Sequence, residues 1–223
     1  MIKIYKFSGY KGLGKLEKIL EKRRSTQNSK LPIVSKILKD IKKNKNKAII
    51  KYEKKFSKNT KLKPSIIEID KSLKSLSPKI KNAINHAYNR IFKYHSLQKI
   101  KNINYKDNLN NNLRYKSVPI NKVGIYVPAN LPSTLLMNAI PAKIAGVKKI
   151  ILANPRLNKK LNPAVIYAAK KLGIKEIFSI GGAQAIGSLA YIQKVDKIVG
   201  PGNIYVAKAK KEVFGDVGVE GMV

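Results

Sequence analysis

Cysteine and tryptophan are absent from this chain of 223 residues, and histidine occurs only twice. Without cysteine, the chain has no disulfide and no thiolate to bind a metal ion. His86 and His95 lie on one helix-like segment, with no cluster of carboxylates near them in the sequence. This spacing is not typical of a metal site, so we predict no metal ligand here and interpret both histidines as partly exposed helix residues.

Long apolar runs are also missing. No run approaches the ~18 residues needed to cross a bilayer, and the start, MIKIYKFSGYKG, lacks the apolar core of a signal peptide. We therefore expect a cytoplasmic protein that does not associate with membranes. With 43% apolar residues, the chain can bury the core of one or two domains.

Acidic residues are scarce, with 12 against 47 basic residues and a net charge of +35. Such a charge attracts polyanions, so one alternative is a Lys-rich nucleic-acid-binding protein. Only five of the basic residues are Arg, whereas nucleic-acid readers depend on Arg for bidentate contacts to phosphate and guanine. The abundance of Lys, Asn and Ile indicates an A- and T-rich genome instead, and we expect no specific nucleic-acid partner.

The first half of the chain has the apolar spacing of amphipathic helices. One pattern runs from Val34 to Tyr52 with a break at Asn44 to Asn46, and a second follows the helix-start pair Ser77 and Pro78. Between them, residues 64–70 (PSIIEID) favour a strand, and residues 102–117 form a polar connector. We place a domain boundary there, with a helix-rich region over 1–117 and an α/β domain over 118–223.

The second half alternates strand and helix patterns four times. The predicted strands are apolar without clean alternation, which is typical of a parallel sheet covered by helices on both faces. Pro141, inside one predicted helix, is expected to kink or split it. The predicted strands span 123–127, 149–153, 176–180 and 197–200, and the helices span 133–146, 163–173, 183–191 and 204–214.

Small or amide-bearing turns follow each predicted strand: PAN, NP, GGAQ and GPGN. In a parallel sheet these turns meet at the carboxyl edge, where ligands bind and helix N-termini favour anions such as phosphate. The amides of Gln184 and Asn203 could bond a ribose or a carboxamide. Plainer interpretations remain open: a tight turn at Gly200 and Gly202, a helix cap for Asn203, and a core aromatic for Tyr126.

Long segments of the second half closely resemble successive blocks of the histidinol dehydrogenase family. They are VGIYVPANLPSTLLMNAIPAKIAGVKKIILANP, SIGGAQAIGSLAY and KVDKIVGPGNIYVAKAKKEVFG followed by VGVEGMV. A weaker resemblance continues upstream, through AYNRIFKYHSLQ. That family oxidises L-histidinol to L-histidine in two NAD-dependent steps, with a zinc ion in the site.

The resemblance implies an incomplete Rossmann-like α/β fold of the aldehyde and histidinol dehydrogenase type, working as a homodimer. It places NAD contacts at Tyr126, Gln184 and Asn203. The loop 129–133 is shorter than its family counterpart and lacks a glycine pair. The family's zinc ligands and general bases belong to sequence that would follow Val223, so we assign no catalytic residue and expect this chain to be inactive alone. A non-catalytic copy that folds poorly is the remaining alternative.

Overall fold

The computed structural model describes residues 13–28 and 32–221, so the first twelve residues, where we predict no signal core, lie outside the described part. A five-stranded sheet occupies its centre, in the order β5-β4-β3-β6-β7, with every neighbouring pair parallel. The four strands predicted in the second half of the chain are confirmed, and β7 is an addition at one edge. The strands are β3 (Lys122–Tyr126), β4 (Lys149–Ala153), β5 (Glu176–Phe178), β6 (Lys197–Val199) and β7 (Gly218–Val219).

The four helices predicted between these strands are also confirmed. They are α5 (Pro132–Ile144), α6 (Pro163–Lys171), α7 (Gly182–Tyr191) and α8 (Ile204–Val213). Pro141 does not split its helix, because α5 continues through it, and the alternative of a kink stays a prediction. Proline cannot donate to the carbonyl of residue 137, so this one hydrogen bond of the helix is missing.

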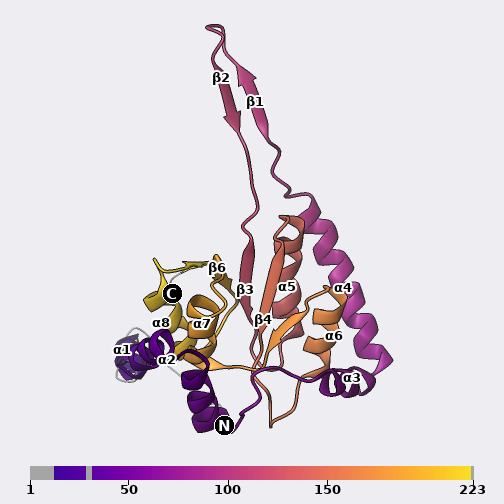
Figure 1. The fold of residues 1–223 in the computed structure, drawn as a ribbon. Helices are drawn as coiled ribbons and strands as arrows, with labels where there is room; N and C mark the ends of the chain where they lie inside the picture. The colour runs from indigo at the N-terminus through magenta and orange to yellow at the C-terminus, as the bar shows by residue number, and fades with distance from the viewer. Residues whose placement is uncertain (1–12, 29–31, 222–223) are drawn as a thin grey trace.

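Helices cover both faces of the sheet (Figure 1). On one face α7 and α8 pack with α2 (Pro32–Ser57), and on the other α5 and α6 pack with α3 (Ile66–Lys74) and α4 (Pro78–Ser96). Adjacent strand residues enter different cores: Ile151 is buried on the α7 side and Leu152 on the α5 side. The predicted sheet with two buried faces is therefore confirmed. A further helix, α1 (Leu13–Asn28), precedes α2.

Helix α2 bends at the position that the sequence predicts. Lys45 has non-helical backbone angles (φ 50, ψ −130), which divide α2 into two helical parts. The Asp40 carboxylate joins the two parts, because it accepts from Asn44 Nδ2 at 2.6 Å and from Lys51 Nζ and Tyr52 Oη at 2.9 Å. The hydrogen bond from Lys51, with smaller contributions from Asn44 and Tyr52, lowers the pKa of Asp40 to about 2.

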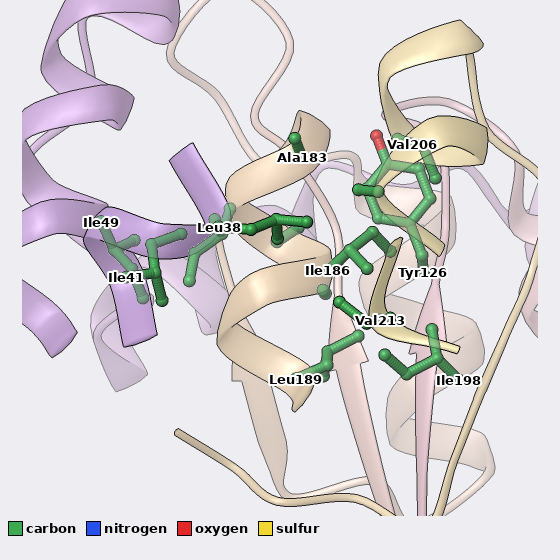
Figure 2. Close-up of a cluster of buried hydrophobic side chains, with 14 of the residues drawn as sticks. Leu38, Ile41, Ile49, Tyr126, Ala183, Ile186, Leu189, Ile198, Val206 and Val213 are labelled. Atoms are coloured by element: carbon green, nitrogen blue, oxygen red, sulfur yellow. The ribbon is translucent and has the colours of Figure 1, made fainter. Parts of the chain in front are cut away.

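The packing of α2 on α7 is the main contact between the two halves of the chain. Leu38 and Ile41 of α2 lie against α7 beside Ala183 and Ile186, as Figure 2 shows. Gly187 permits this approach, since a Cβ there would lie 2.9 Å from Ile41 Cδ1. Because α2 and α4 contribute to the same two cores as the sheet, the cores cross the boundary near residue 117, and the two-domain division stays a prediction.

Residues 64–70 form no strand, so that prediction is wrong. The segment contains the start of α3, which begins with a capping box. Ser65 Oγ accepts from Glu68 N at 3.2 Å, and Glu68 Oε2 accepts from Ser65 N at 2.9 Å. The Ser-x-x-Glu spacing is a helix start signal that outweighs the strand preference of the isoleucines. Helix α4 begins at Pro78 behind the Ser77 cap, as predicted.

The predicted polar connector contains a β-hairpin, β1 (Ile103–Lys106) and β2 (Asn112–Tyr115), which projects away from the body (Figure 1). Asp107 shapes its turn, because Oδ1 accepts from the backbone N–H groups of Leu109 and Asn111 at 2.8 Å. Ile103 faces Tyr115 across the strands, so the hairpin has an apolar face, yet every strand residue is exposed. Four-residue strands without burial leave too weak an apolar pattern for the sequence to show.

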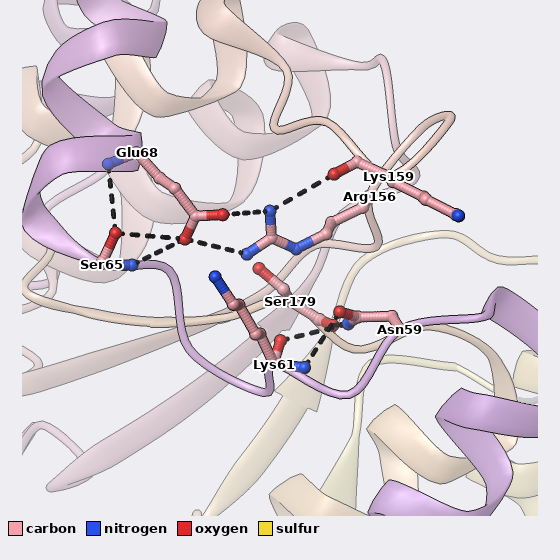
Figure 3. A network of polar contacts seen from close by, with 7 residues as sticks. All are labelled: Asn59, Lys61, Ser65, Glu68, Arg156, Lys159 and Ser179. Atoms are coloured by element: carbon pink, nitrogen blue, oxygen red, sulfur yellow. Dashed lines mark hydrogen bonds and ion pairs between the residues drawn. The ribbon is translucent and has the colours of Figure 1, made fainter.

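The loop that follows β4 is held to α3 by an ion pair (Figure 3). Arg156 Nη1 lies 3.0 Å from Glu68 Oε1, and Nη2 lies 3.3 Å from Oε2. The Arg156 side chain is only 7% exposed. This guanidinium first, and then the backbone N–H of Ser65, lower the pKa of Glu68 to about 2. Beside it, Asn59 Nδ2 donates to the Ser179 carbonyl at 2.8 Å, which holds the segment after α2 to the end of β5.

The lowered pKa of Glu68 predicts a specific acid sensitivity. A carboxyl group whose pKa is lower in the folded state adds stability above its ordinary pKa, and this is lost as the pH falls toward the folded value. We therefore expect Glu68 to contribute to a loss of free energy of unfolding between about pH 4.5 and 2. Urea unfolding at several pH values should show a smaller loss in this window for both Glu68→Gln and Arg156→Met. An unchanged pH profile in both variants would contradict the assignment.

Candidate functional site

The sheet order predicts where a ligand should bind. The chain leaves β3 toward α5 on one face and leaves β6 toward α8 on the other, so the neighbours β3 and β6 form a topological switch point. Ligands of open α/β sheets bind at the carboxyl ends of the strands at such a point. A cavity of about 400 Å³ lies at this edge, and its lining includes Tyr126, Gln184 and Asn203 together. Apolar walls come from Ile33, Ile37, Phe56, Pro155, Ala183 and Tyr205.

Tyr126 ends β3 and is both a core residue and part of the cavity wall. Its side chain is 5% exposed and shares a core with Ile186 and Val206 (Figure 2). Burial raises the pKa of Tyr126, a hydrogen bond involving the Gly182 backbone lowers it, and the negative charge of Glu53 adds to the rise. The hydroxyl therefore stays protonated at neutral pH, and the two interpretations of Tyr126 are compatible.

Gln184, in the first turn of α7, is held by Glu53 of α2. Glu53 Oε1 accepts from Gln184 Nε2 at 2.8 Å and from Gly181 N at 2.9 Å. Both side chains are buried, Glu53 at 1% and Gln184 at 3% exposure. The sequence prediction missed Glu53, although its position four residues after Ile49 could have signalled it. That spacing places Glu53 and Ile49 on one face of the helix, a face that Tyr52 continues.

Asn203 caps α8, as the plainer interpretation expected. Its Oδ1 accepts from Tyr205 N at 3.1 Å and Val206 N at 3.2 Å. Asn203 is exposed at the cavity, so its Nδ2 is the atom with which it can contact a ligand. The capping role and the predicted contact role therefore use different atoms.

The turn before Asn203 requires glycine and is held by an ion pair. Gly200 has φ +107, and a Cβ there would lie 2.0 Å from the carbonyl oxygen of Tyr126. Lys210 of α8 donates to the Gly200 carbonyl and to Glu220 Oε1, which also accepts from Gly200 N at 3.0 Å. Glu220 is thus a structural residue. Asp196 is structural too, since its Oδ2 accepts from Lys122 N at 2.7 Å at the start of β3.

A second, larger cavity of about 600 Å³ lies at the opposite end of the sheet. It is bordered by Val123 at the start of β3, by the base of the hairpin and by His95 and Gln98 at the end of α4. His95 Nδ1 lies 2.6 Å from Gln98 Oε1. His86 is exposed on α4. None of the three predicted contact residues lines this cavity, so the cavity at the carboxyl edge is the candidate site.

The described residues contain no cluster of three or more His, Asp or Glu that could hold a metal ion. Zinc therefore does not fit the part of the chain seen here, and no chemical step through zinc can be derived from it. Among the same residues, no helix combines the length and apolar character needed to cross a membrane.

The fold defines an α/β protein of the incomplete Rossmann type, with a cavity at the switch point of a parallel sheet. The chain belongs to the histidinol dehydrogenase family, whose sequence pattern matches residues 20–223. The histidinol dehydrogenase of Pelagibacter ubique is 57% identical over 215 residues, covering 93% of this chain and 50% of the relative. That of Rhodospirillum rubrum is 40% identical over 210 residues, covering 89% of this chain and 48% of the relative.

A solved structure agrees with this assignment. The crystal structure of histidinol dehydrogenase from Elizabethkingia anophelis superposes with a TM-score of 0.81 at 38% identity. The match covers 86% of this chain and 47% of that one. The chain thus spans about half the length of the relatives that it matches.

The crowding at Gly200 predicts a large effect of a small substitution. In Gly200→Ala, the new methyl group would collide with the Tyr126 carbonyl. Gly215 is a matched control, because its φ is +101 but nothing lies within 4 Å of an added Cβ. We expect Gly215→Ala to lower the free energy of unfolding by about 1–3 kcal/mol through backbone strain alone. Urea unfolding should show a clearly larger loss for Gly200→Ala, and equal losses would contradict the described turn.

Proposed function

We propose that the cavity at the carboxyl edge binds NAD, and that the full-length protein is an NAD-dependent histidinol dehydrogenase that oxidises L-histidinol to L-histidine. The observation that carries the proposal is the convergence of Tyr126, Gln184 and Asn203 on one cavity at the switch point. These residues come from three separate places, the end of β3, the first turn of α7 and the turn before α8. Family membership supports the same function.

The lining of the cavity suits part of a dinucleotide. Its volume of about 400 Å³ and its apolar walls can enclose one ring system. Gln184 supplies an acceptor oxygen, and the Asn203 amide supplies a donor. When bound, NAD would supply the hydride acceptor, and the residues of this chain would hold and orient it.

We place the remaining chemistry in the half of the relatives that this chain does not cover. Zinc, the bases that remove protons from L-histidinol, and the rest of the substrate site would come from that half. The two halves together would form a cytoplasmic homodimer acting on a small molecule. Because lysine far outnumbers arginine, we propose no specific nucleic-acid partner, only weak salt-sensitive attraction to polyanions.

The dual role of Asn203 predicts a separable effect on binding. Asn203→Ser keeps a good helix cap but removes the amide donor. We expect NADH affinity to fall about fivefold, as for one lost hydrogen bond of about 1 kcal/mol, with little change in melting temperature. NADH fluorescence titration of the purified chain measures the affinity.

Asn162→Ser is the matched control. Asn162 caps α6 in the same way, with Oδ1 accepting from Ala164 N at 2.9 Å and Val165 N at 3.1 Å. It does not line the cavity, so NADH affinity should stay unchanged. A purified, folded chain that binds no NADH, or equal losses in both variants, would contradict the proposal.

A further inference from the structure

The cavity borders the N-termini of α7 and α8, and a side chain of the protein accepts hydrogen bonds from backbone N–H groups at each. Such N-termini favour phosphate through their unpaired N–H groups and positive dipole end. At α8, Asn203 Oδ1 takes the Tyr205 and Val206 N–H groups. At α7, Glu53 Oε1 takes the Gly181 N–H at 2.9 Å. At α8 a side chain thus caps the first turn, whereas at α7 a carboxylate stands at the Gly181 N–H, just before the first turn.

Glu53 does more than occupy the end of α7, because it brings a negative charge to it. The residue is 1% exposed and its charge acts on Tyr126, another wall of the cavity. A phosphate at the first turn of α7 would meet this carboxylate in a poorly solvated place, where like charges repel strongly. The carboxylate thus disfavours an anion at the N-terminus of α7 and leaves this position to a neutral group.

Glu53 also sets the direction of the Gln184 amide. A carboxylate only accepts hydrogen bonds, so the amide nitrogen of Gln184 must point toward it, as the 2.8 Å contact shows. The amide oxygen then lies on the side of Gly182, 3.1 Å from the position of a Cβ built on that glycine. Both Gly182 and Gln184 line the cavity, and the oxygen is the atom of the Gln184 amide that is left to accept a hydrogen bond from a ligand.

We propose that Glu53 is a positioning and specificity residue of the cavity, which selects the nucleoside part of NAD and rejects its pyrophosphate. It acts through Gln184, whose oxygen it presents to a ribose hydroxyl or a carboxamide, and through the charge it places at the N-terminus of α7. Glu53 itself does not line the cavity. This inference rests on the proposed NAD site, but it predicts an effect that NAD binding alone does not.

Displacement of NADH from the chain at about 0.15 M salt tests the inference, a concentration at which surface charges are well screened. The competitors are adenosine, nicotinamide riboside and inorganic pyrophosphate. One or both nucleosides should displace NADH from the unmodified chain, and pyrophosphate should not. In Glu53→Gln, which keeps the shape but removes the charge, pyrophosphate should displace NADH at a concentration at least about tenfold lower. In Glu53→Ala, NADH itself should bind more weakly.

Asp70→Asn is the matched control, because it removes the same charge from an exposed position on α3. In Asp70→Asn, each of the three competitors should displace NADH to the same extent as from the unmodified chain. Circular dichroism checks that each variant folds. If Glu53→Ala does not fold, the result for the conservative variant Glu53→Gln tests the inference. Equal displacement by pyrophosphate from the unmodified chain and from Glu53→Gln would overturn the inference.

Failure of the NAD proposal remains distinguishable. If NADH does not bind, direct calorimetry with a nucleoside and with pyrophosphate replaces displacement. A nucleoside that binds the unmodified chain, with pyrophosphate binding gained in Glu53→Gln, would support the role of Glu53 and overturn the NAD site. If no nucleoside binds either, both proposals are wrong.

Discussion

The packing of α2 against α7 is the contact on which the candidate site depends. Gly187 lets Ile41 approach α7 closely, and the same contact brings Glu53 to the first turn of α7. The N-terminal helices are therefore not a separate appendage to the sheet. They supply one wall of the cavity, through Ile33, Ile37 and Phe56, and the carboxylate that orients Gln184.

At the carboxyl edge of the sheet, the same residues stabilise the fold and line the cavity, but they use different atoms for the two roles. Asn203 uses Oδ1 to cap α8 and leaves its amide nitrogen for a ligand. Tyr126 packs its ring in the core and places part of its surface on the cavity. At the Gly200 turn, Lys210 donates to the Gly200 carbonyl and Glu220 accepts from the Gly200 N–H, so both side chains hold the backbone in place. Contacts within the chain thus fix these side chains, and a ligand that binds to fixed groups pays a lower ordering cost.

The second half of the chain was predictable because its local signals agree with one another. Apolar strand runs, caps such as Asn162 and the glycines that end helices mark the same helix and strand boundaries. In a parallel sheet, the turns that follow the strands then meet at the carboxyl edge. The first half was less predictable, because at α3 two local signals conflict and at the hairpin the local signal is weak. The isoleucines before Glu68 favour a strand, but the capping box starts a helix there. The strands of the hairpin are exposed and only four residues long, so their sequence carries only a weak strand pattern. Glu53 was missed because its partners lie about 130 residues away.

The most direct test of the account is to map where NAD contacts the chain. In an amide NMR titration of the isotope-labelled protein, NAD should shift the signals of Gly181, Gly182 and Asn203 at the carboxyl edge. Signals around His95 and Gln98, at the other cavity, should stay in place. Shifts centred on the His95 cavity, with the Gly181 to Gln184 signals unchanged, would contradict the assignment of the site.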